Sequence, residues 1–156
     1  MKKLLIAILL VLSVGCAEPE ENNVESEIGA ILDLYIQSVN EADYDLLREI
    51  WVESDDISYV NPINRLQSSE GLEGFWQTFL EDSFSERDLR RTNVSIRAAG
   101  NEAAWAVFDW EFDATMSDGQ PFSETGWETQ FYRLTDQGWR IEHIHYSTTP
   151  APTPED

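Results

Sequence analysis

The chain contains one cysteine, Cys16, in 156 residues, and few basic side chains. A lone cysteine cannot form an intramolecular disulfide, so packing and hydrogen bonds must stabilise any folded part. Only 10 Lys and Arg stand against 30 Asp and Glu, which gives a formal net charge of −20. Because proteins bind nucleic acid and anionic lipid headgroups mainly through Lys and Arg, this charge excludes both as direct partners. It is typical of a soluble acidic domain, and a surface made for a cationic partner is the alternative.

No apolar run is long enough to span a bilayer. The longest, Leu4–Leu12, has about half of the ~20 residues that a spanning helix needs. It follows Lys2 and Lys3, and the small residues after it end at Gly15-Cys16, which is the layout of a secretory signal. The pair resembles the box of bacterial lipoproteins, whose cysteine accepts a lipid, although the leucine preferred three places earlier is Ser13 here. A signal peptide cleaved elsewhere, with an incidental cysteine, is the alternative.

These features predict four segments. Residues 1–15 are a signal peptide, 16–23 a lipidated acidic tether, 24–148 a single folded domain, and 149–156 a disordered Pro-rich tail. The residue after the cysteine is Ala17, not Asp, and by resemblance to lipoprotein sorting this favours the outer membrane. We therefore expect a lipid-anchored protein of the bacterial cell envelope that faces the periplasm and touches the membrane only through its anchor.

Apolar residues at three- and four-residue spacing predict helices in the first half of the domain. They predict one helix over 24–39, a second over 44–51 capped by Asp43, and a third over 69–80. Between the last two, residues 57–60 form a short predicted strand that ends at Asn61-Pro62, since proline cannot donate to a sheet ladder.

Aromatic and β-branched runs separated by Gly, Asn and Asp turns predict strands in the second half. The predicted strands are 89–99, 103–115, 122–134 and 139–148. Helices followed by an antiparallel meander predict an α+β domain in which the sheet curls around the helices.

The long strands have two unlike faces, and neither is simply apolar inside and polar outside. In the second strand Phe108 and Trp110 alternate with Asp109 and Glu111. One side of such a sheet is expected to line a pocket, while the other meets a second subunit. The pattern therefore predicts a homodimer through the outer face of the sheet.

Four segments carry a resemblance to a known family: Tyr59–Pro62, Glu70–Trp76, Glu128–Arg133 and Gly138–Ser147. In this order they resemble the nuclear transport factor two-like superfamily, and within it SnoaL-like domains, ketosteroid isomerase and the association domain of calcium/calmodulin-dependent protein kinase type II. The resemblance covers about residues 24–152. It implies a cone-shaped curved antiparallel sheet wrapped around N-terminal helices, with a pocket for a small, largely apolar ligand.

Ketosteroid isomerase moves a proton with an Asp base, and a Tyr and a neutral Asp donate to the oxyanion. By resemblance the tyrosine corresponds to Tyr35, the base to Asn61 and the second acid to Gln130. An amide cannot accept a proton near neutral pH, so the resemblance implies that this enzyme's base is missing. Arginines in the pocket of the kinase domain correspond to Asp109, Gln130 and Tyr146, which implies a different and non-anionic ligand. The expected pocket lining is Tyr35, Tyr59, Asn61, Trp76, Asp109, Gln130 and Tyr146.

Other acids lie on the predicted strands, namely Asp109, Glu111, Glu128 and Glu142. A carboxylate buried in an apolar pocket has its pKa raised into the range useful for proton transfer. Asp109 and Glu128 are the candidates for this role, with Tyr35 as donor to an oxyanion. Solvated strand residues are the alternative.

His143 and His145 lie two residues apart on one predicted strand, a spacing that is seen in metal sites. No local motif supplies a third ligand, and the resemblance places the pocket on the other parity, with Glu142, Ile144 and Tyr146. We expect the histidines to be hydrogen-bonded structural residues near the dimer face, with no metal and no cofactor.

Two functions are consistent with these patterns. The first is a lipid-anchored domain that binds a small, largely apolar molecule without catalysis. The second is an isomerase, cyclase or dehydratase that uses Asp109 or Glu128 together with Tyr35. They differ in one feature, because an enzyme needs a titrating acid inside the cavity, whereas a binding protein needs only shape and hydrogen bonds.

Overall fold

Helices form the first part of the chain, of which the computed structural model describes residues 21–150. Helix α1 spans Glu21–Glu41, α2 Tyr44–Ile50 and α3 Ser69–Trp76, and α3 continues as a π-helical turn, η1, over Gln77–Asp82. The three predicted helices are thus confirmed, and Asp43 caps α2 by accepting from the backbone N–H of Leu46. No helix within 21–150 combines the length and the apolar character that crossing a membrane requires. The predicted signal peptide and Cys16 lie outside the described residues.

Within residues 21–150, six strands form one sheet in the order β2-β1-β6-β5-β4-β3. The strands are β1 (Ser58–Val60), β2 (Arg65–Gln67), β3 (Phe84–Ala98), β4 (Ala103–Met116), β5 (Pro121–Thr135) and β6 (Gly138–Thr148). Strands β3 to β6 form the predicted antiparallel meander. The sheet is mixed rather than purely antiparallel, because β1 pairs in parallel with β6 after a long connection that contains α3 and the meander.

The sequence patterns missed two parts of this sheet. Strand β2 has three residues and follows the Asn61-Pro62 turn, so no alternation could be recognised in it. Strand β3 begins at Phe84 rather than at Leu89, because the polar residues 85–88 interrupt the apolar pattern although they are hydrogen-bonded to β4.

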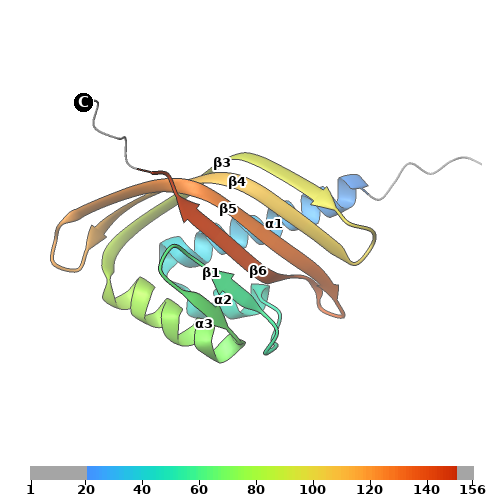
Figure 1. Ribbon diagram of the computed structural model, residues 1–156, viewed down its shortest axis with the longest axis horizontal. Helices are drawn as coiled ribbons and strands as arrows, with labels where there is room; N and C mark the ends of the chain where they lie inside the picture. The colour runs from blue at the N-terminus through green and yellow to red at the C-terminus, as the bar shows by residue number, and fades with distance from the viewer. Residues whose placement is uncertain (1–20, 151–156) are drawn as a thin grey trace, which may run out of the picture.

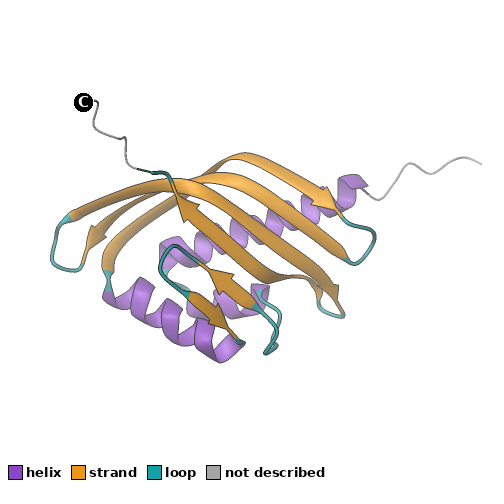
Figure 2. Cartoon of the chain, viewed as in Figure 1, coloured by secondary structure: helices purple, strands orange, loops and turns teal. Residues whose placement is uncertain are grey.

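The sheet is strongly curved, and the helices lie on its concave side (Figure 1). Figure 2 shows the two layers, with α1 crossing behind the long strands and α3 at the lower edge of the view, next to the short strands β1 and β2. Helix α1 turns one stripe of side chains into the core, made by Ile28, Leu32, Tyr35 and Val39. At its C-terminal end, Asn40 exchanges two hydrogen bonds with the backbone of Leu89 on β3, at 3.0 and 2.6 Å. This clamp fixes the position of Tyr35 relative to the sheet.

The two faces of β4 separate as the alternation predicts. Phe108, Trp110 and Phe112 are buried on the concave side, whereas Val107 and Glu111 are exposed on the other. The concave side of the sheet therefore supplies an aromatic wall opposite α1 and α3.

Candidate functional site

A cavity of about 230 Å³ lies between the concave face of the sheet, α1, and the α3–η1 segment. Aromatic side chains make up most of its wall. The lining residues are Tyr35, Val39, Tyr59, Pro62, Ile63, Trp76, Phe79, Leu89, Trp110, Phe112, Phe122, Glu124, Glu128, Tyr146 and Thr148. The predicted hollow cone is thus present, and its polar groups are few.

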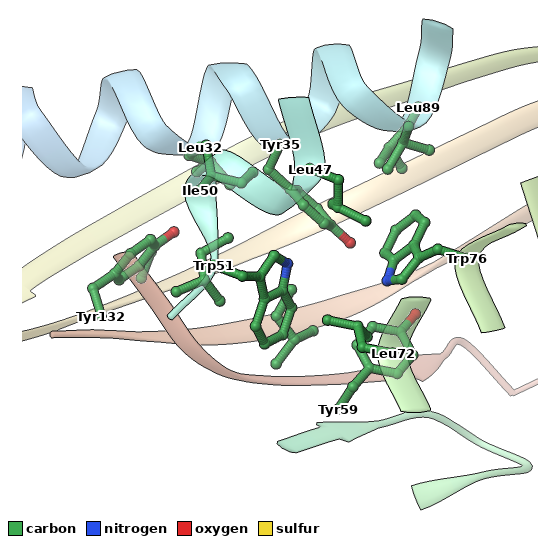
Figure 3. Packing of buried hydrophobic residues seen from close by; sticks show 14 of the residues in the cluster. Leu32, Tyr35, Leu47, Ile50, Trp51, Tyr59, Leu72, Trp76, Leu89 and Tyr132 are labelled. Carbon is green, nitrogen blue, oxygen red and sulfur yellow. The ribbon is translucent and has the colours of Figure 1, made fainter. Parts of the chain in front are cut away.

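Five aromatic rings follow one another around this cavity in edge-to-face contacts. The series runs Tyr35, Trp76, Tyr59, Tyr146 and Trp110, with centroids 5.7 to 6.1 Å apart and planes inclined by 61 to 88°. Figure 3 shows Tyr35 from α1, Trp76 from α3 and Tyr59 from β1 approaching the same space from three sides. Rings that meet at steep angles form the walls of a box, so a bound molecule would face several π-systems at once.

Among the residues that the structure describes, Glu128 on β5 is the one deeply buried carboxylate of this wall, with 4% of its surface exposed. The side-chain amide of Gln130 donates to Glu128 Oε1 at 2.6 Å, and the hydroxyl of Tyr132 donates to Gln130 Oε1. On the cavity side, the hydroxyl of Tyr35 donates to Glu128 Oε2 over a long 3.4 Å. One carboxylate oxygen is therefore held firmly, and the other makes only a weak contact.

Burial raises the pKa of Glu128 to about 7, and the hydrogen bonds from Gln130 and Tyr35 oppose the shift. Burial, and then the nearby Glu128, raise the pKa of Tyr35 well above its usual value, so this hydroxyl stays a donor. No Lys, Arg or His of residues 21–150 lines the cavity. The charge of Arg91 partly opposes the burial that raises the pKa of Tyr132, but this guanidinium is paired with Asp33 on α1 at 2.5 Å. The site therefore holds a carboxyl group that is poised between its two protonation states near neutral pH.

This raised pKa predicts how stability depends on pH. Glu128 has a pKa of about 7 when folded and about 4.5 when unfolded, so between these values the folded chain binds more protons. The free energy of unfolding should therefore fall as pH rises from 4.5 to 7, by up to about 3 kcal/mol from this group. Urea unfolding of the wild type and of Glu128→Gln at pH 5 and pH 8 isolates the effect. The variant should gain relative stability at pH 8, and a difference that does not change with pH would contradict the assignment.

Five of the residues named from the sequence meet at this cavity: Tyr35, Tyr59, Trp76, Glu128 and Tyr146. They come from α1, β1, α3, β5 and β6, so the fold alone brings them together. Glu128 and Tyr146 are direct partners in the pairing of β5 with β6.

Asp109 lies on the outer face of the sheet, so the prediction that it lines the pocket is wrong. In the pairing of β4 with β5, Asp109 stands opposite the exposed Trp127, while Phe108 stands opposite Glu128. Its carboxylate accepts from the side-chain amide of Asn93 at 2.6 Å. The reason is the parity of β4, whose aromatic residues take the concave side. Glu111 and Glu142 also point away from the cavity, and they pair with Arg90 and Arg133.

Asn61 and Gln130 were predicted to line the pocket. Both are buried, but neither is in the wall of the cavity. The side-chain oxygen of Asn61 accepts from the backbone N–H groups of Ile63 and Asn64, at 2.9 and 2.7 Å, and so closes the turn after β1. Gln130 lies behind Glu128 and orients it. The two amides therefore support the site from outside its wall.

The apolar end of the cavity, which was not predicted from the sequence, is lined by Phe79, Phe112 and Phe122. Phe112 continues the alternation of Phe108 and Trp110 on the concave face of β4, so this alternation could have predicted it as a lining residue. Phe79 stacks on Phe75 with centroids 5.4 Å apart, in the turn where α3 becomes η1. A π-helical turn cannot be recognised from residue spacing alone, and such turns are frequent at functional sites.

His143 and His145 share the outer face of β6, as predicted, with ring centroids 6.5 Å apart. His143 Nδ1 lies 2.7 Å from the hydroxyl of Ser58, so this ring is hydrogen-bonded. Within residues 21–150, no group of three or more His, Cys, Asp or Glu side chains is arranged to hold a metal ion.

Comparison with known families identifies the domain. The model of the SnoaL-like domain matches residues 28–152. The chain belongs to this family. A nuclear transport factor 2 (NTF2-like) superfamily protein from Salmonella enterica serovar Typhimurium is 33% identical, with a TM-score of 0.79 over 85% of this chain and 94% of that chain. The fold is thus the expected NTF2-like α+β cone.

More distant structures share this fold. A hexachlorocyclohexane dehydrochlorinase, LinA-type3, from Novosphingobium barchaimii is 14% identical, with a TM-score of 0.72 over 83% of this chain and 88% of that chain. A protein from Xanthomonas campestris, described as a calcium/calmodulin-dependent protein kinase II association domain, is 17% identical, with a TM-score of 0.68 over 80% and 86%. No curated protein matches the sequence.

Proposed function

We propose that this SnoaL-like domain binds a small, largely apolar molecule in its cone and that Glu128 acts on that molecule as a general base. One observation carries the proposal, namely a carboxyl group with a pKa of about 7 in the wall of an aromatic cavity. A general base is most efficient when its pKa lies near the working pH. Solvated carboxylates, by contrast, would have favoured a purely binding role.

The two oxygens of Glu128 suit different tasks. Gln130 holds Oε1, so the carboxylate keeps one orientation, while Oε2 has only the long contact with Tyr35. Oε2 can therefore take a proton from an acidic C–H bond of the bound molecule. The electron pair of that bond then moves into the neighbouring carbonyl or expels a leaving group, and the hydroxyl of Tyr35 lies close enough to donate to the developing negative charge. Returning the proton to another atom completes an isomerisation, and releasing the leaving group completes an elimination.

Proton exchange on simple carbonyl compounds tests this function. Cyclohexanone and acetophenone are incubated in D2O with the protein, and deuterium uptake at the α-carbon is followed by NMR. We expect uptake above the buffer rate, rising with pH through about 7 as Glu128 loses its proton. The proposal fails if the protein adds nothing to the buffer rate for either ketone and also retains no small molecule in native mass spectrometry after purification from its own host.

We also propose the lipid anchor and the envelope location that the sequence indicates. Support comes from the Lys2-Lys3 start, the short apolar run and the Gly15-Cys16 pair. A lipid on Cys16 would place the cone at the outer membrane, facing the periplasm. Expression of the full chain in a bacterium with labelled palmitate should label the wild type and not Cys16→Ser, and equal labelling of both would exclude Cys16 as the anchor.

A homodimer through the outer face of the sheet is the third part of the proposal. Trp127 and Phe131 on β5 are 49% and 46% exposed, and on β4 Trp105 pairs directly with Phe131 while the exposed Val107 pairs with Thr129, which lies between the two β5 aromatics. Contiguous exposed apolar side chains of this kind mark interaction surfaces.

This surface predicts a change of oligomeric state. Phe131→Glu should convert a dimer into a monomer in analytical ultracentrifugation, because the new carboxylate would be buried without a partner. Met116→Glu, which adds the same charge at the β4–β5 hairpin, should leave the dimer intact. A wild-type protein that sediments as a monomer at every concentration would exclude this interface.

A further inference from the structure

The charge of the cavity wall is uniform in sign, and this bears on the class of ligand. Its only ionisable side chains with an acidic pKa are Glu128 and Glu124, both on β5, and within the described chain no cationic side chain faces them. Buried charges in proteins are normally paired, because the free energy lost when a charge leaves water is not recovered without an opposite charge nearby. The carboxylate form of Glu128 has donors in Gln130 and Tyr35 but, among residues 21–150, no counter-charge.

The rest of the wall is suited to the same kind of partner. The ring series from Tyr35 to Trp110 surrounds the cavity with steeply inclined aromatic planes, two of them indoles. Aromatic faces attract cations through their quadrupole, and tryptophan does so most strongly. An aromatic box that also contains a carboxylate, and lacks Lys, Arg and His, is the arrangement that recognises organic ammonium groups.

We infer that the cavity takes a small organic cation, an apolar molecule with a protonated or quaternary amine, and that Glu128 is its counter-ion. This names the ligand class of the site and rests on the proposed binding function, but not on any turnover. The net charge of −20 would favour the approach of such a ligand to the cone.

The ligand would also set the state of Glu128. A cation beside the carboxyl favours its ionised form and so lowers its pKa below that of the ligand-free site. Glu124, on the same strand, is the other carboxyl group of the wall, and burial raises its pKa as well. The remaining titratable groups that face Glu128 are the hydroxyls of Tyr35 from α1, Tyr59 from β1 and Tyr146 from β6, with Tyr132 on its own strand. Their pKa values are raised, chiefly by burial, so they stay neutral, while β4 contributes only apolar rings here.

Two probes of equal shape test the inference. Phenyltrimethylammonium and tert-butylbenzene differ in charge and not in outline, and their binding to the intact protein is measured by quenching of tryptophan fluorescence at pH 8 and pH 5. We expect the cation to bind at least tenfold tighter than the hydrocarbon at pH 8. This preference should shrink at pH 5, because Glu128 is then protonated and neutral.

Two variants complete the test. Glu128→Gln should reduce the preference at pH 8 at least tenfold and leave tert-butylbenzene within about twofold, which also shows that the cavity is intact. Glu102→Gln removes an equal charge from an exposed turn and should change neither affinity. The inference is overturned if the hydrocarbon binds the wild type as tightly as the cation, if neither probe binds, or if Glu128→Gln keeps the preference. If the hydrocarbon binds as tightly as the cation but the neutral ketones still exchange deuterium, the cation inference fails and the proposed general-base function stands.

Discussion

Glu128→Gln should slow α-proton exchange on a bound ketone by about 10² to 10⁴, the contribution typical of a positioned general base. Glutamine keeps the length and planarity of the side chain, and its amide can still meet Gln130 and Tyr35, so the fold should survive. What the variant loses is the group that accepts the proton. The measurement is the initial rate of deuterium uptake at pH 8, where the wild-type carboxyl is ionised.

Glu102→Gln serves as the matched control, since it makes the same chemical change at an exposed residue between β3 and β4. It should exchange at the wild-type rate. If Glu128→Gln retained the wild-type rate while circular dichroism showed it folded, Glu128 would not be the base.

The second large effect is expected at Gly126, where β5 passes beneath Trp110. A Cβ added there would lie 1.9 Å from the backbone oxygen of Ser147 and 2.6 Å from Cζ2 of Trp110. The backbone of β6 and a wall of the cavity would both have to move. Gly126→Ala should therefore lower the free energy of unfolding by about 3 kcal/mol or more, at the upper end of overpacking effects. Urea unfolding at constant pH measures this change.

Gly74 provides the opposite case. It lies in α3 with nothing within 4 Å of an added Cβ, so Gly74→Ala should stabilise the protein by about 0.5 to 1 kcal/mol. Equal effects at the two glycines would show that the close contact of β5 with β6 and Trp110 is wrong.

Most of the architecture was predictable from local patterns. The stripe Ile28, Leu32, Tyr35 and Val39 identifies α1 and its buried face, and the turns at Gly100, Gly119 and Gly138 separate the long strands. All three glycines have φ between 75 and 95°, which other residues rarely adopt. The parallel pairing of β1 with β6 was not predictable, because it joins segments far apart in the chain and no local signal specifies a partner.

The site was predictable only in part. Tyr35, Tyr59, Trp76, Glu128 and Tyr146, which resemblance or position on the strands predicted as pocket candidates, line the cavity. The choice between Asp109 and Glu128 depended on which face of β4 turns inward, and a one-residue change of parity moves a side chain to the opposite side of the sheet. The aromatic residues of β4 carried that information, since their burial places Asp109 outside.

The protonation state of Glu128 depends on its surroundings in the folded structure. Its pKa is set by desolvation and by donors that include Tyr35, 93 residues earlier in the chain. Sequence spacing shows neither the depth of burial nor the lack of a neighbouring cation. The sequence alone favoured binding without catalysis, whereas the carboxyl group in the cavity wall favours catalysis.

A titration of Glu128 itself tests the central claim most directly. With glutamate labelled at the side-chain carboxyl carbon with ¹³C, the signal that is missing in Glu128→Gln identifies the residue, and its chemical shift is followed from pH 3 to pH 9. We expect a midpoint at about 7, well above that of the exposed glutamates. A midpoint near 4.5 would mean that Glu128 is solvated, and neither the proposed base nor its cavity would then stand.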